Sequence, residues 1–210
     1  MPKSEIFEKL YSDYDRWFDE HDAIYRCELE ALRQILPPFT KGLEVGVGTG
    51  RFAAPLGIQV GVEPSPKMAA IARKRGIEVV PGVAEALPFA DKSFDLVLMV
   101  TTICFVDDID KSFEEAKRVL SDDGHLVIAF VDRDSPLGRF YEAHKDESRF
   151  YKEATFYSKK DIFKLLKRHG FILKRCNEAL FGESLEALRC EIYEGCKKGG
   201  AFLTLIARKK

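Results

Sequence analysis

The amino-acid sequence predicts an α/β fold with a doubly wound, mostly parallel sheet and helices on both faces. Short apolar segments alternate with amphipathic segments from residue 42 onward, which is the order of a parallel sheet with crossover helices. Residues 97–100 and 126–131 are apolar at every position, as expected for central strands that helices cover on both faces. A chain of 210 residues suits one domain of this kind, so we expect a single domain over residues 1–210.

The pattern of apolar residues places the individual strands and helices. The expected strands occupy residues 42–46, 58–62, 77–80, 94–100, 126–131, 171–173 and 201–207. The expected helices occupy residues 24–36, 66–75, 112–120 and 158–169, with turns at 121–124 and 197–200. The first helix ends at Pro37, because proline lacks the N–H donor and clashes with the preceding turn. Ser158 is the expected N-cap of the last helix, and Gly170 its left-handed C-cap. We expect residues 201–207 to close an edge of the sheet.

The charge balance and the apolar runs limit the function classes. The 33 basic and 34 acidic side chains leave a formal net charge of -1, so the chain lacks the positive field that gathers nucleic acid. Residues 1–10 lack the apolar core of a signal peptide, and no apolar run approaches the roughly 20 residues that cross a bilayer. We therefore expect a cytoplasmic protein without nucleic-acid partners or membrane insertion. No pattern in the chain predicts the oligomeric state.

Cysteine and amide contents give two further expectations. The five cysteines include no C-x-x-C pair and have neither metal-binding spacing nor an even disulfide framework. We interpret them as mostly buried thiols and expect no metal site. Asn177 is the only Asn, and Gln34 and Gln59 are the only Gln, whereas Lys, Arg and Glu are plentiful. Such a composition is typical of proteins from hot environments, and we expect a thermophile source.

A glycine-rich turn follows the first strand, at Glu44, Gly46, Gly48 and Gly50. A strand that runs through such a turn into a helix lets the backbone approach a ligand closely, because no side chains block it. Arg51 stands where a dinucleotide-binding fingerprint has its third glycine, which argues against a pyrophosphate ligand. By itself the turn is also compatible with a tight strand-helix connection without a ligand.

An acidic residue ends the second strand. Glu63, followed by Pro64, is expected beside the glycine turn, since neighbouring strands of a doubly wound sheet end at the same edge. A carboxylate at this position accepts hydrogen bonds from both hydroxyls of a ribose. Glu63 alone could equally be a solvated strand end, but its combination with the glycine turn favours the nucleoside site.

These residues resemble the class I S-adenosylmethionine-dependent methyltransferases, particularly the small-molecule enzymes similar to those of quinone biosynthesis. The resemblance covers about residues 11–131 and rests on residues 44–50, Glu63 and residues 82–89, 93–97 and 120–128. It implies S-adenosylmethionine (SAM) as cofactor, and a Rossmann-like sheet of about seven strands with the last strand antiparallel. The residues that it implies in cofactor binding are Glu44, Gly46, Gly48, Gly50, Glu63, Pro64, Ala84, Glu85 and Thr101.

One position departs from the family pattern. Val83 stands where the family commonly has an Asp that accepts a hydrogen bond from the adenine amino group. We expect Glu85, or the backbone around Ala84, to make that contact instead.

Two segments are expected to cover the site: an N-terminal helical cap at about residues 1–37 and a lid or insertion at about residues 132–157. The cap carries Tyr14 and Trp17, whose aromatic faces could stabilise a sulfonium cation and exclude water. Trp17 could instead pack on the core as part of an amphipathic helix. No catalytic residue is predicted, because a SAM-dependent enzyme needs chiefly to hold nucleophile, methyl carbon and sulfur in line.

The methyl acceptor is expected outside the carboxyl ends of the strands, next to residues 101–105 and 132–134. His21 and His144 fall in segments that could supply a general base there, whereas His125 and His169 are expected in structural positions. The fourth strand is not followed by the motif of adenine-N6 methyltransferases, so we expect a small-molecule acceptor. The alternatives are an oxidoreductase that uses a nicotinamide dinucleotide and a non-catalytic SAM-binding protein.

Overall fold

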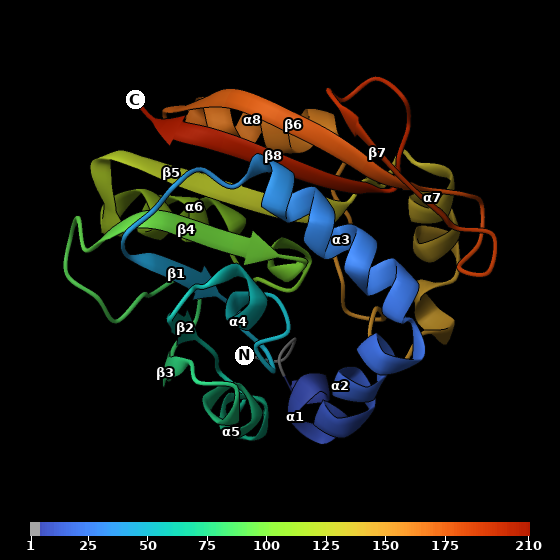
Figure 1. Ribbon diagram of the computed structural model, residues 1–210, viewed down its shortest axis with the longest axis horizontal. Helices are drawn as coiled ribbons and strands as arrows, with labels where there is room; N and C mark the ends of the chain where they lie inside the picture. The colour runs from blue at the N-terminus through green and yellow to red at the C-terminus, as the bar shows by residue number, and fades with distance from the viewer. Residues whose placement is uncertain (1–4) are drawn as a thin grey trace.

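Within residues 5–210, which the computed structural model describes, eight strands form one sheet in the order β3-β2-β1-β4-β5-β8-β6-β7 (Figure 1). The strands are β1 Gly42–Val45, β2 Val60–Val62, β3 Glu78–Val80, β4 Phe94–Val100, β5 Leu120–Val131, β6 Phe171–Phe181, β7 Arg189–Glu194 and β8 Phe202–Lys209. Strands β1 to β5 pair in parallel, and β8 is antiparallel to both β5 and β6. The α/β class and the antiparallel last strand are therefore confirmed, with eight strands where about seven were expected.

The position of β8 corrects one expectation. The chain's last strand does not close an edge of the sheet, because it lies between β5 and β6. Residues 202–207 are buried at every position, as is typical of a strand with neighbours on both sides and layers on both faces. The edge is formed by β7, in a segment where the sequence predicted no strand.

Helices cover both faces of this sheet (Figure 1). They are α1 Glu5–Lys9, α2 Tyr11–Glu20, α3 Asp22–Ile35, α4 Ala53–Leu56, α5 Pro66–Lys74, α6 Ile109–Val119, α7 Pro136–Ala143 and α8 Lys159–Arg168, with 3₁₀ turns η1 Thr102–Cys104 and η2 Lys145–Glu147. Figure 1 shows α3 crossing the sheet in front of β8 and β6, and α6 and α8 behind it. Residues 1–4 of the expected N-terminal cap lie outside the described residues.

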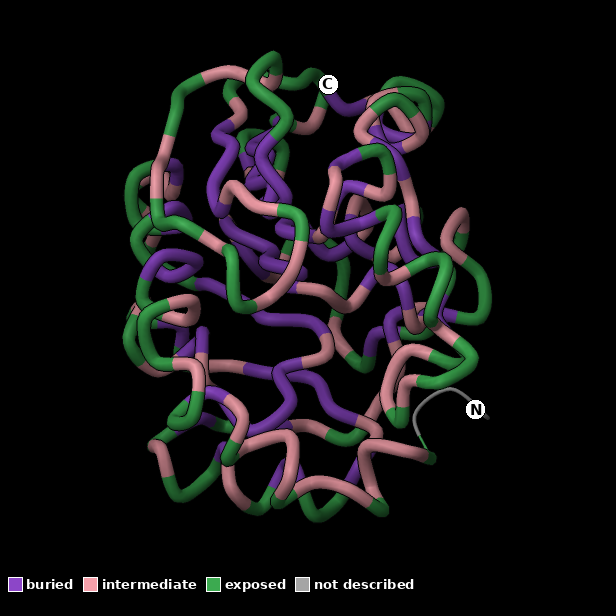
Figure 2. Tube along the Cα trace, turned by 90° about the vertical axis from the view of Figure 1, so that its right-hand side faces the viewer, coloured by how far each residue is buried: buried purple, intermediate pink, exposed green. Residues whose placement is uncertain are grey.

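Strand β4 shows why the central strands are apolar at every position. Leu96 and Leu98 belong to the core cluster on the α3 face, whereas Val97 and Met99 belong to the cluster on the α6 and α8 face. Successive side chains of a strand point to opposite faces, so both faces of β4 are buried. In Figure 2 the buried parts of the trace accordingly run through the middle of the molecule.

The predicted end of α3 and the caps of α8 are confirmed. Helix α3 ends at Ile35, just before Pro37. Ser158 and Asp161 form a capping box, in which the Ser158 hydroxyl accepts from the Asp161 N–H and the Asp161 carboxylate accepts from the Ser158 N–H. Gly170 follows α8 with φ +73°, the left-handed conformation that glycine adopts readily.

Two boundaries differ from the sequence prediction. Strand β6 runs to Phe181 instead of ending at residue 173, because its backbone pairing with β8 continues beneath the exposed side chains of Lys174 and Arg175. Residues 121–124, expected to be a turn, belong to β5, where the register against β4 shifts between the Phe94 and Leu96 pairs. Exposed or irregularly paired strand residues carry no apolar signal, so the sequence pattern missed both.

The interpretation of the cysteines as mostly thiols is wrong. Cys27 of α3 is bonded to Cys190 of β7 across 163 residues, and Cys176 of β6 is bonded to Cys196. The packing of α3 against β7 brings the first pair together, and the antiparallel pairing of β6 with β7 brings the second. The spacing of cysteines in a sequence shows neither arrangement. Cys104 is a buried thiol, as expected, and its Sγ donates to the Thr101 carbonyl.

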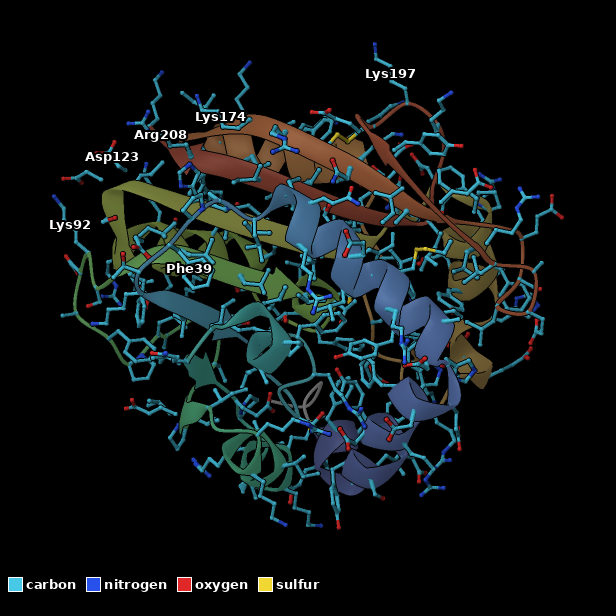
Figure 3. All side chains as sticks on the ribbon, in the orientation of Figure 1. Phe39, Lys92, Asp123, Lys174, Lys197 and Arg208 are labelled. Atoms are coloured by element: carbon cyan, nitrogen blue, oxygen red, sulfur yellow. A yellow bond between two sulfur atoms is a disulfide. The ribbon has the colours of Figure 1, made fainter. Side chains whose placement is uncertain are left out.

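Charged side chains gather at the end of the sheet where the parallel strands begin. Lys92, Asp123 and Arg208 point outward there in Figure 3, and Arg208 forms an ion pair with Asp123. The opposite end of the sheet, at the carboxyl ends of β1, β2 and β4, is covered by the N-terminal helices. Among the described residues no helix is long and apolar enough to cross a membrane.

Candidate functional site

A cavity of about 250 Å³ lies at the carboxyl ends of the parallel strands, beneath α2 and α3. The predicted residues that line it are Tyr14, Trp17, Gly46, Gly48, Glu63, Pro64, Ala84, Glu85 and Thr101. Glu44 and Gly50 do not line it. The chain thus brings most of the predicted cofactor residues to one place, at the edge of the sheet where ligands of doubly wound folds bind.

The glycine turn forms one wall of this cavity. Gly46 has φ +69°, and a Cβ placed on it would lie 2.6 Å from the Thr102 Cγ2, too close for any side chain. Gly48 has φ +55° and lies beside the Tyr14 hydroxyl. Gly50 has φ +82° and packs against Ile77 instead of the cavity, so its glycine serves the contact between the turn and α5.

Glu63 is held rigidly at the end of β2. Its Oε2 accepts from the Gly48 N–H and its Oε1 from the Ser65 N–H, both at 2.9 Å. Burial raises the pKa of Glu63 to about 7, although these two N–H groups partly offset the effect. A carboxylate has about four lone-pair positions, so each oxygen can still accept one more donor from the cavity. The residue therefore fits a pair of ribose hydroxyls.

Glu44 lies behind the turn, not on the cavity wall. Its side chain is buried, burial raises its pKa well above the usual range, and its Oε2 has no hydrogen-bond partner among the described residues. A buried acceptor without a partner costs free energy unless a ligand or water donates to it. This orphaned oxygen beside the glycine turn is compatible with a polar ligand group or a bridging water there.

Helix α2 covers the cavity with aromatic side chains. Tyr14 is partly buried and packs against the core, and desolvation of its hydroxyl raises its pKa. Trp17 stacks on His21 with ring centroids 4.6 Å apart and contacts Phe18 edge-on at 5.3 Å, while also lining the cavity. Trp17 thus packs against the core and also lines the cavity, and its role toward a sulfonium stays a prediction.

The ion pairs of Arg51 account for an arginine at the position where the dinucleotide fingerprint has a glycine. Its guanidinium forms ion pairs with Asp15 at 2.9 Å and Asp19 at 2.7 Å, and Arg75 pairs with the same Asp15 at 2.9 Å. Burial alone would raise the pKa of Asp15, but hydrogen bonds from Arg75 and Arg51 outweigh it and lower the pKa to about 2. This ion-pair network, which sequence reasoning missed, holds α2 onto the glycine turn. The four-residue spacing of the two acids on one helix face is the signal that could have found it.

The segment after β3 lines the cavity next to Glu63. Ala84 and Glu85 are part of the wall, but the Glu85 Oε1 already accepts from the N–H groups of Asp107 and Asp108, at 2.6 and 3.1 Å. The Glu85 carboxylate therefore stabilises the start of α6 as well as facing the cavity. Its role toward adenine, in place of the Asp that Val83 replaces, stays a prediction.

The end of β4 is strained where it meets the cavity. Thr101 has φ +52°, a conformation that β-branched residues rarely adopt and that often accompanies functional sites. The next residue, Thr102, donates its hydroxyl to the Val45 carbonyl at 2.9 Å and so ties β4 to β1. Both threonines and Phe105 line the cavity, as predicted for residues 101–105.

Residues 132–134 do not line the cavity, which corrects the prediction that the acceptor binds next to them. The Asp132 Oδ1 accepts from the N–H groups of Asp134 and Lys159, and Arg133 forms an ion pair with Asp161 at 3.0 Å. These side chains connect β5 to α8. The rest of the expected lid contains α7 and η2, and its role as a lid stays a prediction.

All four histidines lie in the described residues, and none of them lines the cavity. The Nδ1 atoms of His21 and His144 contact the carbonyls of Trp17 and Phe140, respectively. His169 pairs with Asp110, and His125 lies in β5. The two candidate bases are therefore surface and helix-end residues. No cluster of metal-binding side chains occurs in the described part of the chain.

Another set of residues that line the cavity was not predicted. We call the part of the cavity beside them the second chamber, and they are Glu28, Leu137, Tyr141, Tyr151, Leu180, Leu185, Leu188, Ala201 and Phe202. These residues come from α3, α7, the loop after η2, β6, the loop before β7, and the start of β8. The acidic Glu28 within the buried stripe of α3 is the one local signal that could have indicated it.

Comparison with known proteins agrees with this geometry. The family described as "Methyltransferase domain" matches residues 43–128. A crystal structure of a "SAM-dependent methyltransferase, possible histamine N-methyltransferase" from Thermotoga maritima is 46% identical, covers 99% of this chain and 100% of that chain, and superposes with a TM-score of 0.93.

Two further relatives extend the comparison. An uncharacterized protein of Methanocaldococcus jannaschii is 45% identical over 204 residues, which are 97% of this chain and 98% of that protein. Demethylmenaquinone methyltransferase from Chlorobaculum tepidum is 34% identical over 125 residues, or 55% of this chain and 50% of that enzyme. No comparison supports the oxidoreductase or the non-catalytic alternative. The chain belongs to the class I SAM-dependent methyltransferases, and SAM is its cofactor.

Proposed function

We propose that this enzyme transfers the methyl group of SAM to a small molecule that binds in the second chamber. The observation that carries the proposal is that one cavity is lined both by the predicted cofactor residues and by largely apolar and aromatic residues from other elements. Bound SAM supplies a sulfonium-linked methyl that is already electrophilic, so the transfer is an in-line displacement that requires mainly positioning.

The residues of the cofactor half are proposed to bind and orient SAM. Glu63 accepts from the ribose hydroxyls, while Gly46 and Gly48 allow the ligand to approach the backbone. Tyr14 and Trp17 cover this half of the cavity and exclude water. Aromatic faces near a sulfonium also stabilise its positive charge, by on the order of 0.5–2 kcal/mol.

The size and surroundings of the cavity support a small acceptor. Its walls come from both ends of the chain, including α2, α3 and the segment at residues 132–157, so a folded macromolecule does not fit within it. The net charge of -1 offers no field for nucleic acid.

We further propose that the enzyme acts in the cytoplasm of an organism from a hot environment. Scarce amides and two disulfides support this, since intracellular proteins of hyperthermophiles are disulfide-rich.

The first test is a calorimetric titration with SAM and S-adenosylhomocysteine (SAH) on the wild type, Glu63→Gln and a matched control, Glu78→Gln. Glu78 is an exposed glutamate on the neighbouring strand β3, outside the cavity. We expect micromolar binding that weakens at least tenfold in Glu63→Gln, about 1.4 kcal/mol, and is unchanged in Glu78→Gln. Absence of binding to the wild type, or equal affinity in both variants, would contradict the proposed site.

The second test concerns the acceptor. The enzyme is incubated with SAM and either a pool of small metabolites or a pool of proteins and nucleic acids, and SAH release is measured. Release that depends on the small-molecule pool supports the proposal. Release only with the macromolecular pool would refute it.

A further inference from the structure

The second chamber contains one acidic side chain that nothing in the protein neutralises. Glu28 of α3 is only 9% exposed and lines the cavity, and no hydrogen bond or ion pair of its carboxyl occurs within residues 5–210. Burial raises its pKa to about 8. A buried carboxyl without a partner costs folding free energy, and such costs persist mainly where a ligand relieves them.

Another buried glutamate shows what a structural carboxyl looks like in this fold. Glu178 is fully buried, but it pairs with Lys159 at 3.2 Å and accepts from the N–H groups of Lys198 and Gly199, at 2.6 and 2.9 Å. Glu178 thereby fixes the turn before β8. Glu28 has no such donors, so a comparable structural role does not account for it.

The charged side chains of this mostly apolar cavity wall are all acidic. Among its described lining residues are Glu28, Glu63, Glu85 and Asp107, and no Lys, Arg or His. Glu63, Glu85 and Asp107 come from the segments after β2, β3 and β4, which carry predicted cofactor residues. Glu28 is the acidic residue among those that line the second chamber, where a cationic acceptor would find a counter-charge and an anionic acceptor would find none.

The rings around Glu28 also suit a cation. Tyr141 and Tyr151 lie with ring centroids 5.1 Å apart, and Tyr151 stacks on Phe105 at 6.2 Å. Burial is the first cause that raises the pKa values of both tyrosines, and the charge of Glu28 contributes to both. All three residues line the same cavity. Aromatic faces attract ammonium groups, and more strongly when water is excluded.

Resting on the proposed methyltransferase function, we propose that Glu28 determines acceptor choice, and that the acceptor is a small amine whose ammonium group binds the Glu28 carboxylate between the chamber's aromatic rings, while another atom of the same molecule, with a free electron pair, accepts the methyl. In the ligand-free protein the carboxyl is an unpaired buried acid. A bound ammonium group supplies the donors and the positive charge that favour its ionised form.

The test uses three probes of similar shape with the enzyme saturated with SAH. 2-Phenylethylamine is cationic, 2-phenylethanol is neutral and phenylacetate is anionic, and the affinity of each is measured by calorimetry. We expect the wild type to bind the amine at least tenfold more tightly than the alcohol and to reject the acid. Equal affinity for amine and alcohol, or preference for the acid, would overturn the proposal without using any variant.

Two variants then assign the preference to Glu28. Glu28→Gln keeps the shape but removes the charge, and we expect it to lose the amine preference while its SAH affinity stays within twofold of the wild type. The control, Glu30→Gln, changes an exposed glutamate on the same helix. It should alter neither the amine preference nor the SAH affinity. A Glu28→Gln enzyme that keeps the amine preference, or that loses SAH affinity as Glu63→Gln does, would refute the role.

Failure of this inference and failure of the proposed function give different results. Failure of the wild type to bind SAH would refute the site itself, whereas normal SAH binding without amine preference would refute only the inference about Glu28.

Discussion

The ion-pair network under α2 makes a prediction about how the cap stays closed. Asp15 contacts both Arg51 and Arg75, and its side chain is 20% exposed, whereas Asp19 contacts Arg51 from a side chain that is 67% exposed. Replacing Asp15 with Asn removes the counter-charge of two guanidinium groups next to the glycine turn. Replacing Asp19 with Asn removes a largely solvated partner of the same arginine, so it is the matched control.

The magnitude follows from the pKa of Asp15. Its fall from the ordinary value of 3.8 to about 2 corresponds to about 2 kcal/mol of added stability when the carboxylate is ionised. Because solvent screens part of the site, we expect Asp15→Asn to lower the free energy of unfolding by roughly 1–2 kcal/mol at pH 7. An acid whose pKa is lower in the folded than in the unfolded protein stabilises the fold at pH values above its unfolded pKa. For Asp15 this contribution is therefore complete above pH 3.8 and is lost as the pH falls toward the folded pKa of about 2.

The assay is urea unfolding of both variants and the wild type, followed by far-ultraviolet circular dichroism and by the fluorescence of Trp17. Trp17 is the only tryptophan and lies on α2, so its signal reports the cap directly. We also expect Asp15→Asn to weaken SAH binding, because Tyr14 and Trp17 move with this helix. The two variants could lower the free energy of unfolding equally, or the difference between Asp15→Asn and the wild type could persist at pH 2. Either result would show that apolar contacts and not the ion pairs hold the cap.

Two further substitutions test the turn and the disulfide. Gly46→Ala should weaken SAH binding and cost more stability than Gly57→Ala, because both glycines have positive φ but only at Gly46 does a Cβ meet the Thr102 side chain. If the two variants had similar effects on the thermal unfolding midpoint and on SAH affinity, the steric argument would be contradicted. Cys190→Ser should lower the free energy of unfolding by roughly 2–4 kcal/mol under oxidising conditions, through loss of its bond to Cys27. A wild type whose melting is insensitive to a reductant would contradict that disulfide's contribution.

The sequence predicted the parallel part of the sheet well because burial on both faces leaves a continuous apolar pattern. Strands β4 and β5 are recognisable from their residues alone. In β7 all residues are exposed or half-buried, and residues 172–175 of β6 are exposed, so neither strand carries that pattern throughout. Their pairing is determined by backbone hydrogen bonds to neighbouring strands, which a pattern of apolar residues does not contain.

The cofactor half of the site was predictable for a related reason. Gly46, Gly48 and Glu63 lie within 18 residues of one another, at the ends of two adjacent strands, so their local spacing reveals a common site. The second chamber instead combines α3, α7, β6 and the start of β8, whose residues are up to 174 positions apart between Glu28 and Phe202. Only the antiparallel insertion of β8 beside β5 brings these elements together.

A local signal for the second chamber nevertheless exists in α3. Residues 24, 28, 31, 32 and 35 share one face of that helix, and all but one of them are apolar. The exception is Glu28, which is buried with the rest of the stripe from Cys27 to Ile35. A charged residue on the buried stripe of an amphipathic helix requires either an internal partner or a ligand, since burial without one is costly. The structure provides no internal partner within the described chain, and the proposed cationic acceptor would supply the partner that Glu28 lacks.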